Sequence, residues 1–142
     1  MRVLFVCTGN YYRSRFAEAV FNHHAAQNLR TVRAFSRGLA TWMVDGEGDL
    51  SRFAREALVV RRIERACTHE MPVSLTTADL EAAVLTIVLD EDEHRPMMLR
   101  KFPEWDGRVR YWRVADVDRR APEDALADIE AQVLELLSSL PD

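Results

Sequence analysis

Short apolar runs and helix-periodic segments alternate along the chain. Residues 3–6 are continuously apolar, as in a strand that is buried on both faces, and predict a strand over residues 2–7. Residues 14–29 repeat their apolar positions at helical spacing. The same patterns predict strands at 32–36, 83–89 and 109–114, helices at about 50–65, 91–100 and 126–140, and a helix start at 76–79.

This alternation of strands and helices predicts the fold class. Strands that are separated by helices pair in parallel, so we expect an α/β fold with a single doubly wound domain over residues 1–142. The expected sheet has four parallel strands with helices on both faces. Ligands of such sheets bind beyond the carboxyl ends of the strands, which is where residues 7–13 fall.

Composition narrows the classes of partner. The formal net charge is −4, which argues against a nucleic-acid partner held by bulk electrostatics. The chain has two cysteines, too few and too far apart for a disulfide framework. No stretch is apolar enough to span a membrane, and we expect a cytoplasmic protein. The four histidines show no ligand spacing with the cysteines, so neither a metal nor another cofactor is expected.

Candidate chemistry lies in the segment after the first strand. Five residues separate Cys7 from Arg13, about the length of loop that can curl around one phosphate with its N–H groups inward. Arg13 can hold two phosphate oxygens, and Cys7 lies where a nucleophile is needed. Gly9 is expected to allow a close approach and a positive φ. The predicted phosphate site consists of Thr8, Gly9, Asn10, Tyr11, Tyr12, Arg13 and Ser14.

Residues 3–21, with Cys7-Thr8-Gly9-Asn10-Tyr11-Tyr12-Arg13-Ser14 at their centre, resemble the N-terminus of the low-molecular-weight protein tyrosine phosphatases. Arsenate reductases of the thioredoxin-linked type share that fold. The resemblance implies that Cys7 attacks phosphorus and that Ser14 hydrogen-bonds its thiolate. It further implies that Asn10 braces the loop through a serine, matched by Ser36, and a histidine, for which His69 is the candidate.

The family uses an aspartate before the last helix as the general acid. Asp116 takes that place in the best register, and Asp118 stands two residues later as an alternative. Both can also be read as ordinary loop or capping carboxylates. Val117 replaces the proline of the family pattern. The catalytic set expected is therefore Cys7, Arg13 and Asp116.

The surroundings of the loop depart from the family pattern. Tyr11 stands at a position that helps to set substrate choice, and Tyr12 replaces a cysteine that protects the nucleophile. Arg15 replaces a proline, and a charge in the first helical turn suggests an anionic neighbour, either a side chain or part of a substrate. Trp42 matches an aromatic residue of the pocket wall. Tyr11, Trp42 and Asp118 form the expected substrate pocket.

These residues predict a phosphate-monoester hydrolase that acts through a phosphocysteine intermediate, with phosphotyrosine as the leading substrate. The partner would be a phosphorylated protein or a small phosphomonoester, and the sequence does not predict an oligomeric state. A phosphate-binding protein with weakened catalysis is the main alternative. Arsenate reduction is a further alternative, although Cys67 is the only other cysteine that could relay a disulfide.

Overall fold

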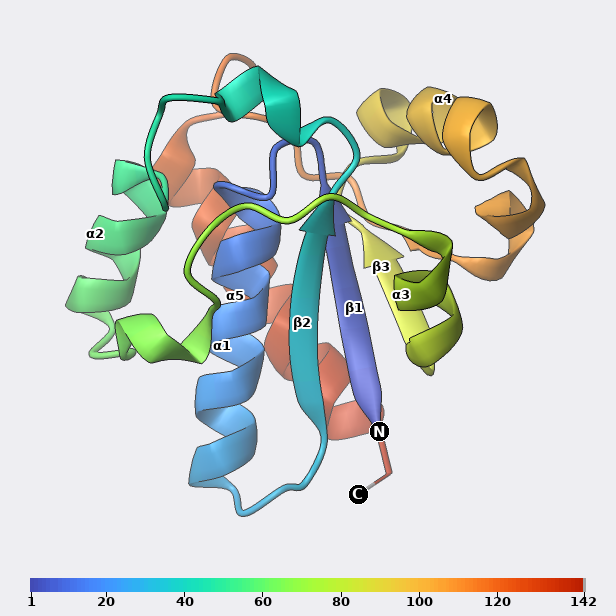
Figure 1. Ribbon diagram of the computed structural model, residues 1–142. Coiled ribbons are helices and arrows are strands. Elements are labelled where there is room, and N and C mark those ends of the chain that lie inside the picture. The colour runs from blue at the N-terminus through green and yellow to red at the C-terminus, as the bar shows by residue number, and fades with distance from the viewer. Residues whose placement is uncertain (142) are drawn as a thin grey trace.

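The computed structural model describes residues 1–141 and contains one sheet of four parallel strands in the order β2-β1-β3-β4 (Figure 1). Its strands are β1 (Arg2–Cys7), β2 (Arg33–Gly38), β3 (Leu85–Val88) and β4 (Arg110–Tyr111). All three strand pairs are parallel, which confirms the predicted fold class. β1 lies inside the sheet and is buried from its second residue onward, in agreement with its continuous apolar run.

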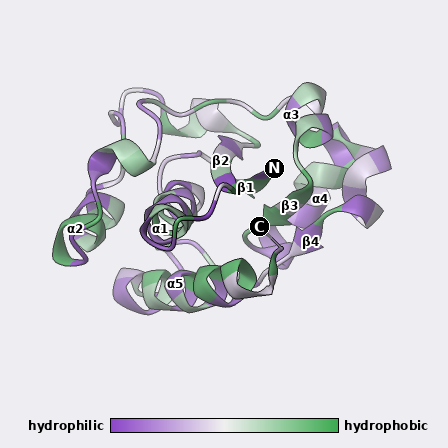
Figure 2. Ribbon diagram, turned by 90° about the horizontal axis from the view of Figure 1, so that it is seen from below, coloured by the Kyte–Doolittle hydropathy of each residue, from purple (hydrophilic) through white to green (hydrophobic). Residues whose placement is uncertain are grey.

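Helices cover both faces of this sheet (Figure 2). α1 (Arg13–Gln27) and α5 (Pro122–Ser139) pack together on one face, and α2 (Arg52–Val60) packs beside them. α3 (Thr77–Ala82) and α4 (Glu91–Lys101) lie on the other face. Short 3-10 helices occupy Thr41–Val44, Arg65–Cys67 and Pro103–Arg108.

Alternate side chains of β1 supply the two halves of the core. Phe5 faces α1 and α5, where its ring meets those of Phe21 and Trp112. Leu4 and Val6 point to the opposite face and join the cluster beneath α3 and α4. This period of two follows from strand geometry, and burial on both faces explains why the run has no polar interruption.

Several predicted elements are shorter in the structure, α2 and β4 most clearly. α2 ends at Val60 because the next turn closes: Arg62 takes a φ of 57°, and the N–H of Ile63 donates to the carbonyl of Leu58 at 2.9 Å. This closure carries Ile63 into the core. β4 has only two residues, and after it Arg113 forms an isolated antiparallel bridge with Asp90. Among the described residues, no helix has both the length and the hydropathy needed to cross a bilayer.

The carboxyl ends of β1 and β2 are held very close together. Cys7 pairs with Gly38, and the N–H groups of Leu39 and Ala40 donate to the carbonyls of Cys7 and Thr8. A Cβ atom at position 38 would lie 2.8 Å from the Thr8 carbonyl oxygen, so only glycine fits there. The end of β2 thereby supports the loop that follows Cys7.

Candidate active site

The nucleophile candidate lies at the junction of β1 and α1. Cys7 is the last residue of β1 and is 2% exposed, and its Sγ lies 2.9 Å from the Oγ of Ser14. Arg13 and Ser14 form the start of α1, whose first turn has neither a side-chain cap nor an acidic residue. The free N–H groups of that turn and the helix dipole favour an anion next to Cys7.

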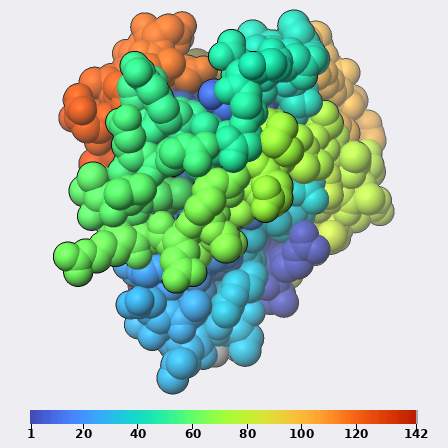
Figure 3. All heavy atoms as spheres, turned by 60° about the vertical axis from the view of Figure 1, so that its left-hand side comes forward, coloured from blue at the N-terminus to red at the C-terminus, as the bar shows by residue number. Residues whose placement is uncertain are grey.

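A cavity of about 260 Å³ opens beside this junction. Cys7 and Arg13 line it together with Asp116, and its walls include Tyr11, Met43, Val44, Phe53 and Val117. In a space-filling view, the teal segment around residue 45 and the orange segment around residue 120 stand on either side of a gap (Figure 3). Only a little of the blue N-terminal chain shows between them, so the cavity is reached from this side.

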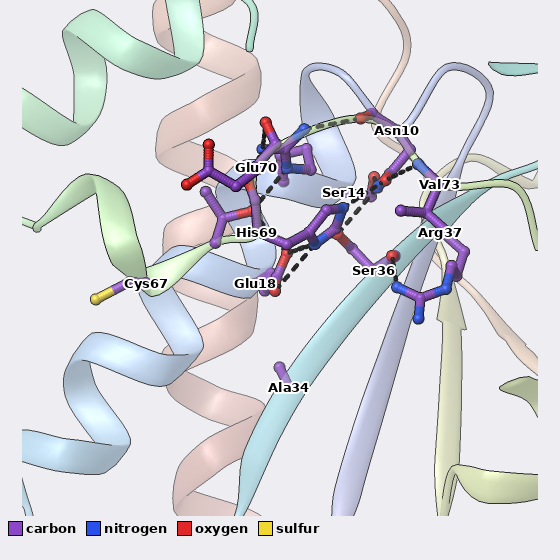
Figure 4. A network of polar contacts seen from close by, with 12 residues as sticks. Asn10, Ser14, Glu18, Ala34, Ser36, Arg37, Cys67, His69, Glu70 and Val73 are labelled. Carbon is purple, nitrogen blue, oxygen red and sulfur yellow. Dashed lines mark hydrogen bonds and ion pairs between the residues drawn. The ribbon is translucent and has the colours of Figure 1, made fainter. Parts of the chain in front are cut away.

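Asn10 holds the loop in shape (Figure 4). It is fully buried at a φ of 52°, and its Nδ2 donates to the hydroxyls of Ser14 and Ser36, each at 2.9 Å. Its Oδ1 accepts hydrogen bonds from the Nε2 of His69 at 2.8 Å and from the N–H of Val73 at 2.9 Å. One side chain thus connects the loop with β2 and with the segment that precedes α3. Both expected partners of Asn10 are in contact with it.

Glu18 completes this network, although the sequence pattern did not mark it as a site residue. Its Oε1 accepts hydrogen bonds from the hydroxyls of Ser36 and Thr68, each at 2.7 Å, and lies 3.2 Å from the Nδ1 of His69. The available signal was a carboxylate between Ala17 and Ala19 on a helix that is otherwise apolar along this stretch. A buried carboxylate needs hydrogen-bond donors, and those donors come from distant segments.

Arg13 is bound by Glu93, a second residue that the sequence pattern did not mark as part of the site. Its Nη1 and Nη2 donate to the two carboxylate oxygens of Glu93 at 3.0 and 2.9 Å, and Nη1 also donates to the Val114 carbonyl. Burial acts to lower the pKa of Arg13, but the hydrogen bond with Glu93 outweighs burial and raises this pKa. At Glu93 burial acts to raise the pKa, but hydrogen bonds from His94 and Arg13 outweigh it and lower the pKa well below the usual range. Both groups are therefore ionised at neutral pH.

Thr8 points its hydroxyl away from the cavity. The hydroxyl bonds to Glu93 and lies 2.9 Å from the Nε2 of His94. Only the main chain of Thr8 therefore remains for the phosphate contact expected of this residue.

Arg15 is fully buried and takes no part in the cavity. Its guanidinium bonds to the Thr68 hydroxyl and to the carbonyls of Asn10, Asp49, His69 and Glu70. Burial lowers its pKa to about 10, so it remains charged at neutral pH. Of the two anionic neighbours that the sequence allowed, a side chain is present: the charge of Glu18 opposes the effect of burial. Arg15 joins three loops beneath the phosphate site.

Comparison with known families agrees with this geometry. The model of the low molecular weight phosphotyrosine protein phosphatase family matches residues 2–140. The chain belongs to this family. It is accordingly a cysteine phosphatase, with Cys7 in the place of the nucleophile. No curated protein matches the sequence significantly.

Several solved structures share the fold of this chain. A low molecular weight protein tyrosine phosphatase from T. tengcongensis is 27% identical, with a TM-score of 0.81 and 99% of each chain covered. The YwlE arginine phosphatase from Geobacillus stearothermophilus is 25% identical, with a TM-score of 0.75 over 96% of this chain and 90% of that one. Wzb from Vibrio vulnificus, in complex with benzylphosphonate, is 20% identical with a TM-score of 0.80 over 98% of each chain, which shows the fold alone.

The two acid candidates of this phosphatase lie in different surroundings. Asp116 lines the cavity, and its Oδ2 is 3.5 Å from the Nη2 of Arg13. Asp118 is exposed and is not among the residues that line the cavity, where Val117 stands instead. Of the two candidates, Asp116 therefore lines the cavity together with Cys7 and Arg13. Asp118 was expected in the pocket wall and is not among the lining residues.

Trp42, which was expected in the pocket wall, is not among the residues that line the cavity. This side chain is 68% exposed on the 3-10 helix Thr41–Val44, and its neighbours Met43 and Val44 line the cavity in its place. In a tight helical turn adjacent side chains point in different directions, and the sequence did not show which of them faces inward. Tyr11 does line the cavity, and its hydroxyl donates to the Glu47 carbonyl at 2.9 Å.

The two remaining loop residues, Gly9 and Tyr12, both line the cavity. Gly9 does not have a positive φ, and the left-handed position of the loop is Asn10. A Cβ at position 9 would lie 2.8 Å from a methyl group of Val44, so a larger residue there would have to displace the Val44 side chain. Tyr12 is buried against Phe53, and its hydroxyl has no hydrogen-bond partner among residues 1–141.

Cys67 lies on the 3-10 helix Arg65–Cys67, and both cysteines are free thiols. Burial raises the pKa of the Cys67 thiol. Within residues 1–141, no group of three or more histidine, cysteine, aspartate or glutamate side chains is arranged to hold a metal ion.

Proposed function

We propose that this protein hydrolyses aryl phosphate monoesters, with phosphotyrosine as its leading substrate. The observation that carries the proposal is the position of Cys7, which lines the cavity beside Ser14, Arg13 and the uncapped start of α1. These groups provide the positive electrostatic environment that stabilises a thiolate and an incoming phosphate together. A thiolate also needs a reducing environment, which supports the expected cytoplasmic location.

The first chemical step transfers the phosphoryl group to the enzyme. The Cys7 thiolate attacks phosphorus, the bond from phosphorus to the ester oxygen breaks, and Asp116 gives its proton to that oxygen. Arg13 and the loop N–H groups hold the three phosphoryl oxygens as charge spreads over them. In the second step water attacks the phosphocysteine, Asp116 takes a proton from the water, and inorganic phosphate leaves the regenerated thiolate.

The cavity wall supports an aromatic leaving group. Its lining is mainly apolar, with Tyr11, Met43, Val44, Phe53 and Val117 around the entrance to Cys7. Such a wall can bury a phenyl ring while the phosphate reaches Arg13. The substrate can then be a phosphorylated protein or a small phosphomonoester, since the cavity is open to solvent on one side (Figure 3).

Rapid-mixing kinetics with para-nitrophenyl phosphate test the proposal. We expect a burst of para-nitrophenol, a trapped phosphocysteine at Cys7 and no turnover by Cys7→Ser. Asp116→Asn should lower kcat by about 10²–10⁴-fold, the usual contribution of a general acid, whereas the exposed Asp118→Asn serves as the matched control and should leave it unchanged. Retention of full activity by Cys7→Ser would refute the proposal. An equal loss of kcat in Asp116→Asn and Asp118→Asn would overturn the assignment of the acid.

The same variants separate the alternatives. A chain that binds inorganic phosphate but shows no burst is a phosphate-binding protein with weakened catalysis. Arsenate reduction would require Cys67 to approach Cys7, so Cys67→Ser would abolish it while leaving phosphatase activity intact.

A further inference from the structure

Glu93 binds one edge of the Arg13 guanidinium. Its two oxygens accept hydrogen bonds from Nη1 and Nη2, so the contact is bidentate and end-on. The side chain of Arg13 is 2% exposed, whereas that of Glu93 is 28% exposed. No described residue bonds to the Nε–H of Arg13, and Arg13 lines the cavity. Apart from Asp116, whose Oδ2 lies 3.5 Å from Nη2, the edge formed by Nε and Nη2 therefore remains for two oxygens of a phosphate.

Glu93 is itself fixed by groups from two elements. The N–H of Asp90 donates to the Nδ1 of the fully buried His94, so the proton of a neutral His94 ring lies on Nε2. That nitrogen lies 2.9 Å from the Thr8 hydroxyl and 3.2 Å from a Glu93 carboxylate oxygen. The Thr8 hydroxyl in turn donates to Glu93. The first turn of α4 adds the favourable dipole of a helix N-terminus.

We infer that Glu93 is a positioning residue of the phosphatase reaction: it orients the Arg13 guanidinium so that its free edge meets the phosphoryl oxygens. Without Glu93, the long side chain of Arg13 would keep only the Val114 carbonyl and the Asp116 carboxylate, 3.5 Å away, as partners. A flexible guanidinium loses most where geometry is most demanding, which is the transition state. The kinetic effects expected of this role rest on the proposed function. The effect on the orientation of Arg13 requires only that the site binds phosphate.

A purely electrostatic role of Glu93 predicts the opposite result. A carboxylate beside a phosphate site repels the ligand, so removal of its charge would tighten phosphate binding. A positioning role predicts weaker binding in the same variants, because alignment of Arg13 is lost. The sign of the change therefore distinguishes the two roles.

The test compares Glu93→Ala and Glu93→Gln with the wild-type protein. For Glu93→Ala we expect kcat for para-nitrophenyl phosphate to fall, and the inhibition constant of vanadate to rise, by about 100-fold, the cost of a misplaced catalytic contact. The dissociation constant of inorganic phosphate should rise by a smaller factor. Glu93→Gln keeps one acceptor for Arg13, so its kcat and its inhibition constant for vanadate should lie between those of the wild-type protein and Glu93→Ala. Asp92→Asn is the matched control, since it removes the same charge one residue away, with a side chain that is 69% exposed.

Tighter phosphate binding by both variants, or unchanged kcat and vanadate inhibition, would overturn the inference. If Glu93→Ala does not fold, Glu93→Gln decides by the same measurements at a temperature below its midpoint of unfolding. If the wild-type protein shows no turnover, the proposed function fails. The phosphate dissociation constants, measured by calorimetry, still judge the role of Glu93 in that case.

Discussion

Replacement of Asn10 tests the idea that one buried amide holds the phosphate loop. Its side chain makes four hydrogen bonds, to Ser14, Ser36, His69 and Val73, and its backbone is left-handed. Glycine at position 10 removes the bonds but tolerates the φ of 52°, whereas alanine removes the bonds and strains the backbone as well. The pair of variants therefore separates the two contributions.

The expected loss follows from the partners that remain. Each hydrogen bond contributes about 1 kcal/mol, and the Ser14 and Ser36 hydroxyls keep contacts with Cys7 and Glu18 after the change. We therefore expect Asn10→Gly to lower the free energy of unfolding by about 3 kcal/mol. Asn10→Ala should cost about 1 kcal/mol more because of its left-handed backbone.

Urea unfolding followed by circular dichroism measures both values by linear extrapolation. Asn28→Ala is the control, since Asn28 is exposed and its side chain makes one bond, to the His24 carbonyl, so its change should stay within about 0.5 kcal/mol. A loss below about 1 kcal/mol for Asn10→Gly would show that the network contributes little to stability. Equal stability of the glycine and alanine variants would refute the strain at this position.

Two further changes test local features of the fold. Leu29 is 88% exposed at a φ of 57° after the end of α1, so Leu29→Gly should raise the free energy of unfolding by about 1 kcal/mol, and an unchanged urea midpoint would contradict this. Tyr12→Phe removes a buried hydroxyl without a partner and should stabilise the fold by about 1 kcal/mol; a loss of stability would reveal a hydrogen bond. Burial raises the pKa of Tyr12 to about 12, so the unfolded chain loses this proton first, and wild-type stability should fall between pH 10 and pH 12 more steeply than that of Tyr12→Phe.

The pattern of the chain was informative where the contacts are local. The strand before Cys7, the loop and the start of α1 are consecutive in sequence, so periodicity and spacing were sufficient to predict their order. The parallel sheet followed because strands separated by helices have few ways to pair. Element ends were less well predicted, as at Val60, where a turn that buries Ile63 ends α2.

By itself, then, the sequence determined the α/β class and the order of the cysteine, loop and arginine for which a phosphate site is proposed, because these depend on neighbours along the chain. Tertiary structure alone decided which distant groups meet that site. It put Asp116 rather than Asp118 at the cavity, and Met43 and Val44 in place of Trp42. It also brought Glu18 to the Asn10 network and Glu93 to Arg13. Such pairings join residues that are tens of positions apart, and their partners are fixed by packing of the helices on the sheet, which periodicity does not record.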